Sequence, residues 1–182
     1  MPLLNSLATP YAEALLQITE VRGESSTVAD QCKQLLEIWD SSPEFREAMV
    51  SPVLEPEAKK KALQTLVGAQ VTPSLLNLLK VLADRQRLIA FDAVLLRFLE
   101  LYREQQGITL AKVRSAQSLS ENQQAALSKK VQAMAGTNKV DIDLSVDPSL
   151  IGGFVVSLGS QVIDASLAGQ VRRLGLALAK AS

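Results

Sequence analysis

The sequence of 182 residues contains no histidine and a single cysteine, Cys32. Without histidine the chain cannot form a Ser-His-Asp triad, use an imidazole general base or hold a haem through a proximal histidine. One cysteine cannot form a disulfide within the chain or a zinc site made of several thiolates. These absences favour binding over catalysis, and we expect no catalytic residue, no metal site and no cofactor.

Long hydrophobic runs are absent as well, since no segment approaches the roughly 18 consecutive apolar residues of a membrane span. The N-terminal segment lacks a basic region ahead of an apolar one, so we expect a soluble chain without a targeting peptide. Lys and Arg together number 19, as do Asp and Glu, and this zero net charge argues against nucleic-acid binding. We expect Cys32 to be a buried, unreactive thiol.

Residues 1–106 show the apolar spacing of helices, interrupted at short intervals by turn signals. The pattern predicts six helices, over residues 4–18, 28–39, 43–48, 57–67, 74–87 and 91–106. A Ser or Thr followed by Pro indicates the starts of the third and fifth, with the hydroxyl able to cap, and Gly107 indicates the end of the last. We expect a helical bundle.

Residues 107–182 alternate between strand-like and helix-like patterns. The expected elements are a strand over 108–114, a helix from Ser120 to Gly136, a strand over 140–146, a hairpin over 153–163 and a closing helix over 166–180. Ser120 and Gln123 form a capping-box pattern, and the four apolar residues of the 140–146 strand share one face. The expected fold is therefore mainly α, a six-helix bundle followed by a small α+β domain.

The predicted fifth helix is the most apolar segment of the chain, with Leu-Leu-Asn-Leu-Leu-Lys-Val-Leu at 75–82. This apolar surface is wider than the stripe of about 100° that a surface helix needs, so two sides of the helix should be covered. Neighbouring helices could cover both sides. Alternatively, this helix and the first one, where Ala8, Ala12 and Ala14 allow close approach, could receive an amphipathic helix from a partner. The periodicity leaves both possibilities open.

Several other patterns favour ordinary structural roles. Lys59-Lys60-Lys61 lies next to glutamates and has no glycine-rich segment nearby, so we expect a solvated helix face rather than a phosphate site. Arg85 and Arg87 receive the same interpretation.

The glycines of the C-terminal part do not match a nucleotide-binding loop. The order of Gly152, Gly153 and Gly159 fits neither the dinucleotide-binding motif nor the P-loop, so we expect them to serve tight turns and close backbone approach. Asp141 and Asp143 share a strand face that could bind a cation, although a solvated face is favoured.

Two motifs in a fixed order carry a family resemblance. They are Pro-Tyr-Ala-Glu-Ala-Leu at 10–15 and Asp-Pro-Ser-Leu-Ile-Gly-Gly-Phe at 147–154, the second followed by Gly159, Asp164 and Ser166. Together they resemble the delta subunit of F-type ATP synthases, which is called the oligomycin-sensitivity-conferring protein (OSCP) in mitochondria. Where that family often has Arg before the Tyr, this chain has Pro10.

The resemblance implies a non-catalytic stator subunit that resists rotor torque during proton-driven ATP synthesis. Residues 1–106 would sit on the catalytic head and hold N-terminal helices of alpha subunits in a groove between the first and fifth helices. Residues 107–182 would bind the peripheral-stalk b subunits. The implied groove residues are Tyr11, Leu15, Leu75, Leu78, Leu79 and Leu82. The C-terminal motif, Gly152, Gly153, Gly159, Asp164 and Ser166, would be structural or stalk-binding.

The resemblance also implies a location and leaves two alternatives. The chain would act at the cytoplasmic or stromal face of an energy-transducing membrane, a thylakoid or a bacterial inner membrane, and would be attached indirectly. The general similarity leans towards the photosynthetic branch. The alternatives are an unrelated helical adaptor with a helix-binding groove and an enzyme whose carboxylates bind a metal; for the enzyme, no convergent cluster of polar residues is evident.

Overall fold

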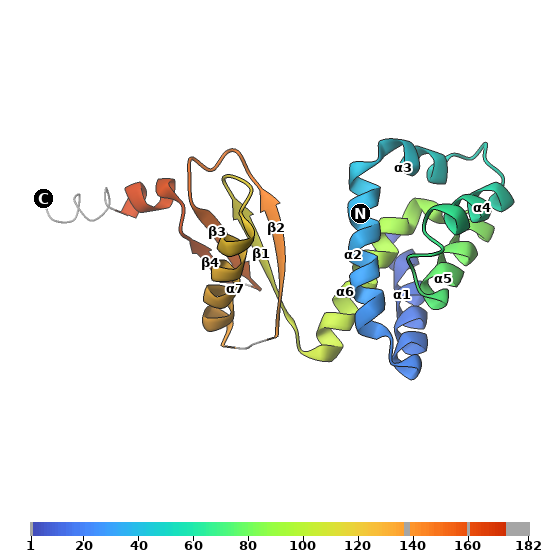
Figure 1. Cartoon of the computed structure of the whole chain (residues 1–182), viewed down its shortest axis with the longest axis horizontal. Helices are drawn as coiled ribbons and strands as arrows, with labels where there is room; N and C mark the ends of the chain where they lie inside the picture. The colour runs from blue at the N-terminus through green and yellow to red at the C-terminus, as the bar shows by residue number, and fades with distance from the viewer. Residues whose placement is uncertain (1, 137–138, 160, 174–182) are drawn as a thin grey trace, which may run out of the picture. The chain divides into compact units, whose positions relative to one another are not determined.

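The computed structural model describes residues 2–136, 139–159 and 161–173. The chain divides into two compact units, Met1–Gln105 and Gln106–Ser182, which we call the N-terminal and C-terminal units (Figure 1). The described residues are mostly helical and include a four-stranded sheet, as the sequence predicts.

Helices make up the N-terminal unit. They are α1 (Pro2–Arg22), α2 (Ser25–Ser41), α3 (Pro43–Val50), α4 (Pro56–Leu66), α5 (Pro73–Asp84), the 3-10 helix η1 (Leu88–Ala90) and α6 (Phe91–Gln106). Proline occupies the first turn of α3, α4 and α5, where its missing N–H costs nothing. The expected side-chain caps are absent, because neither Ser42 nor Thr72 forms one.

Aromatic side chains stack in the core of the N-terminal unit. Trp39 of α2 lies parallel to Phe91 of α6, with ring centroids 4.5 Å apart, and Phe45 of α3 packs edge-on against Phe91. Such pairs add about 1 kcal/mol to the hydrophobic gain of burial. Cys32 of α2 is fully buried in the same core, and desolvation raises the pKa of its thiol, in agreement with the expected unreactive cysteine.

The end of α5 differs from the prediction, because the helix stops at Asp84 instead of continuing to residue 87. The amide of Arg87 donates to the carbonyl of Leu82, and that of Gln86 donates to Ala83, which is the Schellman pattern of a helix end. Gln86 adopts a left-handed φ of 54° to make this turn. The sequence signal was hidden because glycine, not glutamine, usually takes this position.

The C-terminal unit is a sheet with one crossover helix. Its elements are β1 (Thr109–Ser115), α7 (Glu121–Ala135), β2 (Val140–Val146), β3 (Phe154–Leu158) and β4 (Gln161–Asp164), and the strand order is β2-β1-β3-β4. β1 and β2 are parallel and are connected through α7, whereas β1–β3 and β3–β4 are antiparallel. The predicted hairpin of β3 and β4 is confirmed.

α7 lies against one face of this sheet (Figure 1), where its Leu127 and Val131 join the core cluster formed with Val113 and Val156. The predicted capping box is present, with the amide of Ser120 donating to Gln123 Oε1 at 2.9 Å. Gly107 and Gly136 end their helices at φ values of 64° and 65°.

The apolar residues of β2 are only partly covered. Val140 and Ile142 pack against the core cluster, whereas Leu144 and Val146 are 38% and 56% exposed. The chain is helical again over 167–173, where a closing helix was expected; the rest of that predicted helix and Ser160 of the hairpin lie outside the described residues.

Candidate functional site

A groove with a volume of about 580 Å³ lies between α1 and α5 of the N-terminal unit. We call it the α1–α5 groove. Its apolar walls include Tyr11, Leu15 and Ile18 of α1 and Leu78 and Val81 of α5. Its polar lining residues are Arg22, Ser74, Asn77 and Arg87. The two helices that the resemblance singled out therefore enclose an apolar concavity, the kind of surface on which an amphipathic helix can lay its apolar face.

The six groove residues named from the sequence separate into two groups. Tyr11, Leu15 and Leu78 line the groove, and of these Leu15 is only 2% exposed and also belongs to the core cluster. Leu75, Leu79 and Leu82 have no exposed surface and lie in the core.

The core interpretation of α5 applies to one side of the helix, and a partner helix on the other side stays a prediction. One side of α5 lies in the core, and the other side is open. Val81 on the open side is 44% exposed, and Ile18 of α1, which also lines the groove, is 48% exposed. The small residues of α1 divide in the same way, because Ala8 and Ala12 are buried in the core and Ala14 lines the groove.

The polar ends of the groove were not predicted from the sequence. Arg87, interpreted as an ordinary solvated side chain, donates from Nη1 to the phenol oxygen of Tyr11 at 2.8 Å, and its guanidinium carbon lies 5.8 Å from the ring centroid. Arg22 donates from Nη1 to Ser74 Oγ at 3.0 Å, and that hydroxyl in turn donates to Glu24. Side chains far apart in the sequence therefore fix an arginine at each end.

The lysine run also corrects an expectation. Lys59 is only 7% exposed, and its Nζ donates to the backbone carbonyl of Ser51 at 2.6 Å. Lys60 pairs with Asp84 and Glu57 at 2.7 Å each, and hydrogen bonds to these two carboxylates raise its pKa. Lys59 therefore bonds α4 to the backbone at Ser51, and Lys60 bonds it to Asp84 of α5, so this face is not purely solvated.

The two glycines of the C-terminal motif pack closely against the backbone that follows β4. A Cβ on Gly153, at φ 81°, would overlap the carbonyl oxygen of Ala165, which leaves no room for a larger residue. The carbonyl of Gly152 accepts a hydrogen bond from the amide of Leu167 at 2.9 Å.

Asp164 and Ser166 form the cap of the helical residues 167–173. Asp164 Oδ1 accepts from the amide and hydroxyl of Ser166, and Ser166 Oγ accepts from the amide of Gly169 at 3.0 Å. These hydrogen bonds lower the pKa of Asp164. Gly159, at φ 55°, ends β3 before the hairpin turn.

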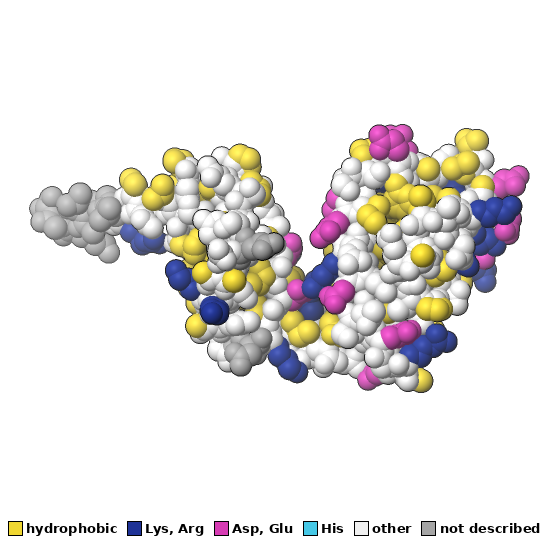
Figure 2. Space-filling model, in the orientation of Figure 1, with side chains coloured by type: hydrophobic (Ala, Val, Ile, Leu, Met, Phe, Trp, Pro, Cys, Tyr) yellow, Lys and Arg dark blue, Asp and Glu magenta, His cyan; other side chains and the backbone are white. Residues whose placement is uncertain are grey.

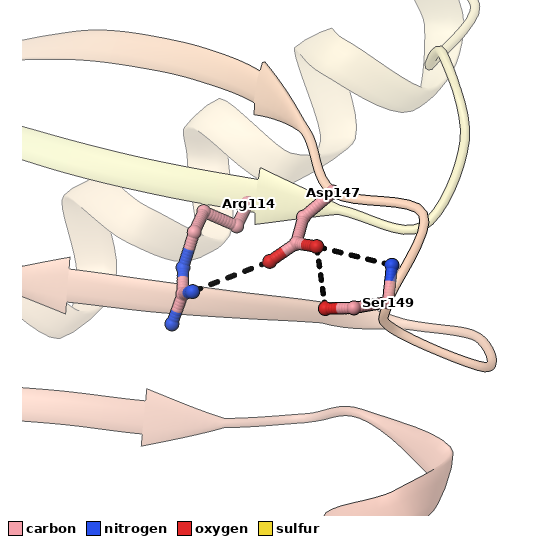
Figure 3. A network of polar contacts seen from close by, with 3 residues as sticks. All are labelled: Arg114, Asp147 and Ser149. Atoms are coloured by element: carbon pink, nitrogen blue, oxygen red, sulfur yellow. Dashed lines mark hydrogen bonds and ion pairs between the residues drawn. The ribbon is translucent and has the colours of Figure 1, made fainter.

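A similar turn follows β2, at the start of the C-terminal motif (Figure 3). Asp147 accepts hydrogen bonds from the amide and hydroxyl of Ser149, and Arg114 of β1 approaches its other carboxylate oxygen at 3.3 Å. The hydrogen bonds from Ser149, supported by the charge of Arg114, lower the pKa of Asp147. The carboxylates of this motif thus hold turns.

A second cavity, of about 480 Å³, lies beside the two glycines in the C-terminal unit, and we call it the Gly-Gly cavity. Leu119, Leu127 and Lys130 line it on the α7 side, and Ile151 and Phe154 line it on the other. Ile151 is 82% exposed, so this cavity has an apolar rim open to solvent.

Among the described residues, no group of three or more His, Cys, Asp or Glu side chains could hold a metal ion. The cation site considered at Asp141 and Asp143 gains no support from the structure. In the part of the chain that is described, no helix is both long and apolar enough to cross a membrane.

On the face drawn in Figure 2, basic and acidic side chains lie among one another on the N-terminal unit.

A family model described as the ATP synthase delta (OSCP) subunit matches residues 7–178. The chain belongs to this family. It is 90% identical over its full length to the ATP synthase subunit delta of Parasynechococcus marenigrum strain WH8102, covering all of that protein. It is 67% identical to the subunit delta of the organellar chromatophore of Paulinella chromatophora, with 99% of each chain covered.

The fold is also that of a solved ATP synthase chain. A chain of the Toxoplasma gondii mitochondrial ATP synthase hexamer superposes with a TM-score of 0.64 at 19% identity, over 94% of this chain and 97% of that one. As a member of the delta (OSCP) family, this chain is a structural, non-catalytic component of the peripheral stalk of an F-type ATP synthase. The alternatives of an unrelated adaptor and of a metal enzyme are therefore discarded.

Proposed function

We propose that the N-terminal unit, as the six-helix bundle implied by the family resemblance, binds the catalytic head by holding an N-terminal helix of an alpha subunit in the α1–α5 groove. The observation that carries this proposal is the groove itself, whose open apolar residues lie on the two helices that the resemblance names. Ile18, Leu78 and Val81 offer apolar area to a partner, and burying it contributes roughly 25 cal/mol per Å² before association costs.

The test is calorimetric titration of the full chain with a synthetic peptide from the N-terminus of the cognate alpha subunit. We expect saturable one-site binding that Leu78→Asp weakens at least about tenfold, because a charge in the apolar groove loses its hydration. Leu66→Asp is the matched control, since Leu66 is 57% exposed on α4 and does not line the groove. Equal losses in both variants, or no binding by the folded chain, would overturn the proposal.

We further propose that the C-terminal unit binds the C-terminal ends of the peripheral-stalk b subunits and that the Gly-Gly cavity takes part. The support is the apolar rim at Ile151, since an apolar side chain 82% exposed beside a cavity is suited to an interface. In a pull-down with a fragment of the cognate b subunit, we expect Ile151→Asp to reduce binding. Val162→Asp is the control, because Val162 lies on β4 and is 65% exposed, and this variant should bind the b fragment normally. If both variants bound the fragment equally well, the Gly-Gly cavity would be excluded from the binding surface.

In this proposal the chain acts mechanically, as the head-side clamp of the stator. It connects the catalytic head to the stalk, so that torque from the rotor does not turn the head. The location that follows is the cytoplasmic or stromal side of a thylakoid or bacterial inner membrane, with attachment through the rest of the complex. The cyanobacterial relatives support the photosynthetic setting.

A further inference from the structure

An arginine lies at each end of the α1–α5 groove, and the described lining residues include no aspartate or glutamate; the carboxylate of Glu24 reaches the Arg22 end through Ser74. Arg22 lies at one end and Arg87 at the other. Among the described residues, neither arginine forms an ion pair with a carboxylate. Each guanidinium therefore retains donors for a partner, because its observed side-chain bond goes to a neutral hydroxyl.

The geometry of α1 and α5 sets the distance between the two charges. Arg87 follows the C-terminal end of α5 and bonds to Tyr11, whereas Arg22 bonds to Ser74 at the N-terminal end of α5, so the two helices are antiparallel. Tyr11 and Arg22 are separated along α1 by a helical rise of about 16 Å. The α1 residue that carries one guanidinium group, Arg22, and the one that bonds the other, Tyr11, are thus about three helical turns apart.

We propose that the occupant of the groove is an amphipathic helix with two carboxylates about 11 residues apart, one bound by Arg22 and the other by Arg87. This inference rests on the proposed function, since it specifies the chemistry of the helix that enters the same groove. A separation of about 11 residues corresponds to three turns, so both carboxylates would lie on the face that carries the apolar residues. An apolar centre with an anionic residue at each end complements the lining charge by charge.

The arginines are positioned in advance of binding. Tyr11 holds Arg87 by a hydrogen bond and by the face of its ring, and buried Ser74, itself bonded to Glu24, holds Arg22. A side chain that is already fixed loses less conformational freedom when the partner arrives. The guanidinium groups therefore specify where on the partner helix the carboxylates must be.

The test uses three designed helical peptides of about 22 residues with the same apolar stripe. One has two glutamates spaced by about 11 residues, one has them moved to opposite faces, and one has glutamine in their place. In titrations of the full chain we expect the first peptide to bind at least about tenfold more tightly than the others near 50 mM salt, with most of this advantage lost near 500 mM. Equal affinities, or no binding by any peptide, would overturn the inference.

Variants of the chain locate the effect. Arg22→Gln and Arg87→Gln should each weaken binding of the correctly spaced peptide about threefold to fivefold and leave the glutamine peptide unaffected. Arg85→Gln is the matched control, because Arg85 is an exposed arginine outside the groove lining. Tyr11→Phe, which keeps the ring and removes the hydrogen bond to Arg87, should give a smaller loss. Losses of the same size in Arg85→Gln would contradict the assignment.

The designed peptides separate this inference from the proposed partner. If the alpha peptide fails to bind while the spaced-glutamate peptide shows the arginine dependence, the partner is wrong and the charge pattern stands. If the alpha peptide binds but the three designed peptides bind equally, the partner stands and the charge pattern is wrong.

Discussion

Gly153 lies so close to Ala165 that a Cβ on the glycine would overlap the carbonyl oxygen of the alanine. The contact brings the segment before β3 against the residues that follow β4. Gly153 adopts a φ of 81° at this contact. The glycine is therefore required both by its backbone conformation and by the space around it.

The first prediction follows from this contact. Gly153→Ala should destabilise the C-terminal unit by about 3 kcal/mol, because it combines a strained φ with a backbone clash. Gly159→Ala is the control for strain alone, since its φ is 55° and no atom lies within 4 Å of the added Cβ; it should cost about 1 kcal/mol. Urea unfolding followed by amide NMR signals of β3 measures both, and equal costs would show that the clash relaxes.

The second prediction separates the two sides of α5. Leu79→Ala should lower the free energy of unfolding of the N-terminal unit by about 3 kcal/mol, because Leu79 is fully buried, whereas half-buried Leu78→Ala should cost about 1 kcal/mol. The order should reverse for binding of the alpha peptide. Thermal unfolding and calorimetry on the same two variants test this, and a larger binding loss for Leu79→Ala would contradict the assignment of sides.

The third prediction concerns Gln86, whose φ of 54° turns the chain so that Arg87 reaches Tyr11. Gln86→Gly should stabilise the N-terminal unit by about 0.5 kcal/mol by relieving the left-handed conformation. Gln86→Val should destabilise it by about 1.5 kcal/mol, because a β-branched residue strongly disfavours that region. Midpoints of urea unfolding measure both changes, provided that the dependence of the unfolding free energy on urea concentration stays the same. If Gln86→Val stabilised the unit, the assignment of a Schellman motif to this helix end would be wrong.

The fourth prediction concerns Cys32, which burial makes a poor nucleophile by raising its pKa. Only the thiolate reacts with a disulfide reagent such as DTNB, so the native chain at pH 8 should react at least about 100-fold more slowly than the chain in urea. Absorbance of the released thiol follows both reactions. Fast labelling of the native chain would mean that α2 opens readily.

The fifth prediction concerns acid. The folded pKa values of Asp147 and Asp164 lie below their ordinary values, so their ionised forms stabilise the fold above pH 4 or so, and this contribution is lost as the pH falls through the folded pKa. Asp147→Asn and Asp164→Asn should each reduce the pH dependence of unfolding of the C-terminal unit between about pH 5 and pH 2. Unchanged profiles in both variants would exclude these turns as the cause.

Much of the fold could be predicted because its signals are local. Proline at helix starts, Gly107 and Gly136 at helix ends, and the Ser120–Gln123 capping box each depend on a few neighbouring residues. Gln86 was missed because it adopts a left-handed conformation that its residue type does not favour.

The candidate site was predicted less completely. Periodicity predicted that two sides of α5 would be covered, but one side is open, and which leucines are core depends on the neighbouring helices. For the same reason Leu75 and Leu79 could not be distinguished from Leu78 by spacing. The side chain of Arg87 bonds to Tyr11, 76 residues away, and no local pattern encodes that pairing.

The position of β1 in the sheet has a mechanical consequence. β1 begins two residues after Gly107 and is paired on both sides, with β2 and with β3. Tension transmitted along the chain through Gly107 therefore enters the C-terminal unit at a central strand. Extracting that strand requires two hydrogen-bond ladders to break together, whereas an edge strand could be peeled away one bond at a time. The connection between the units is thus anchored at a well-supported point of the sheet.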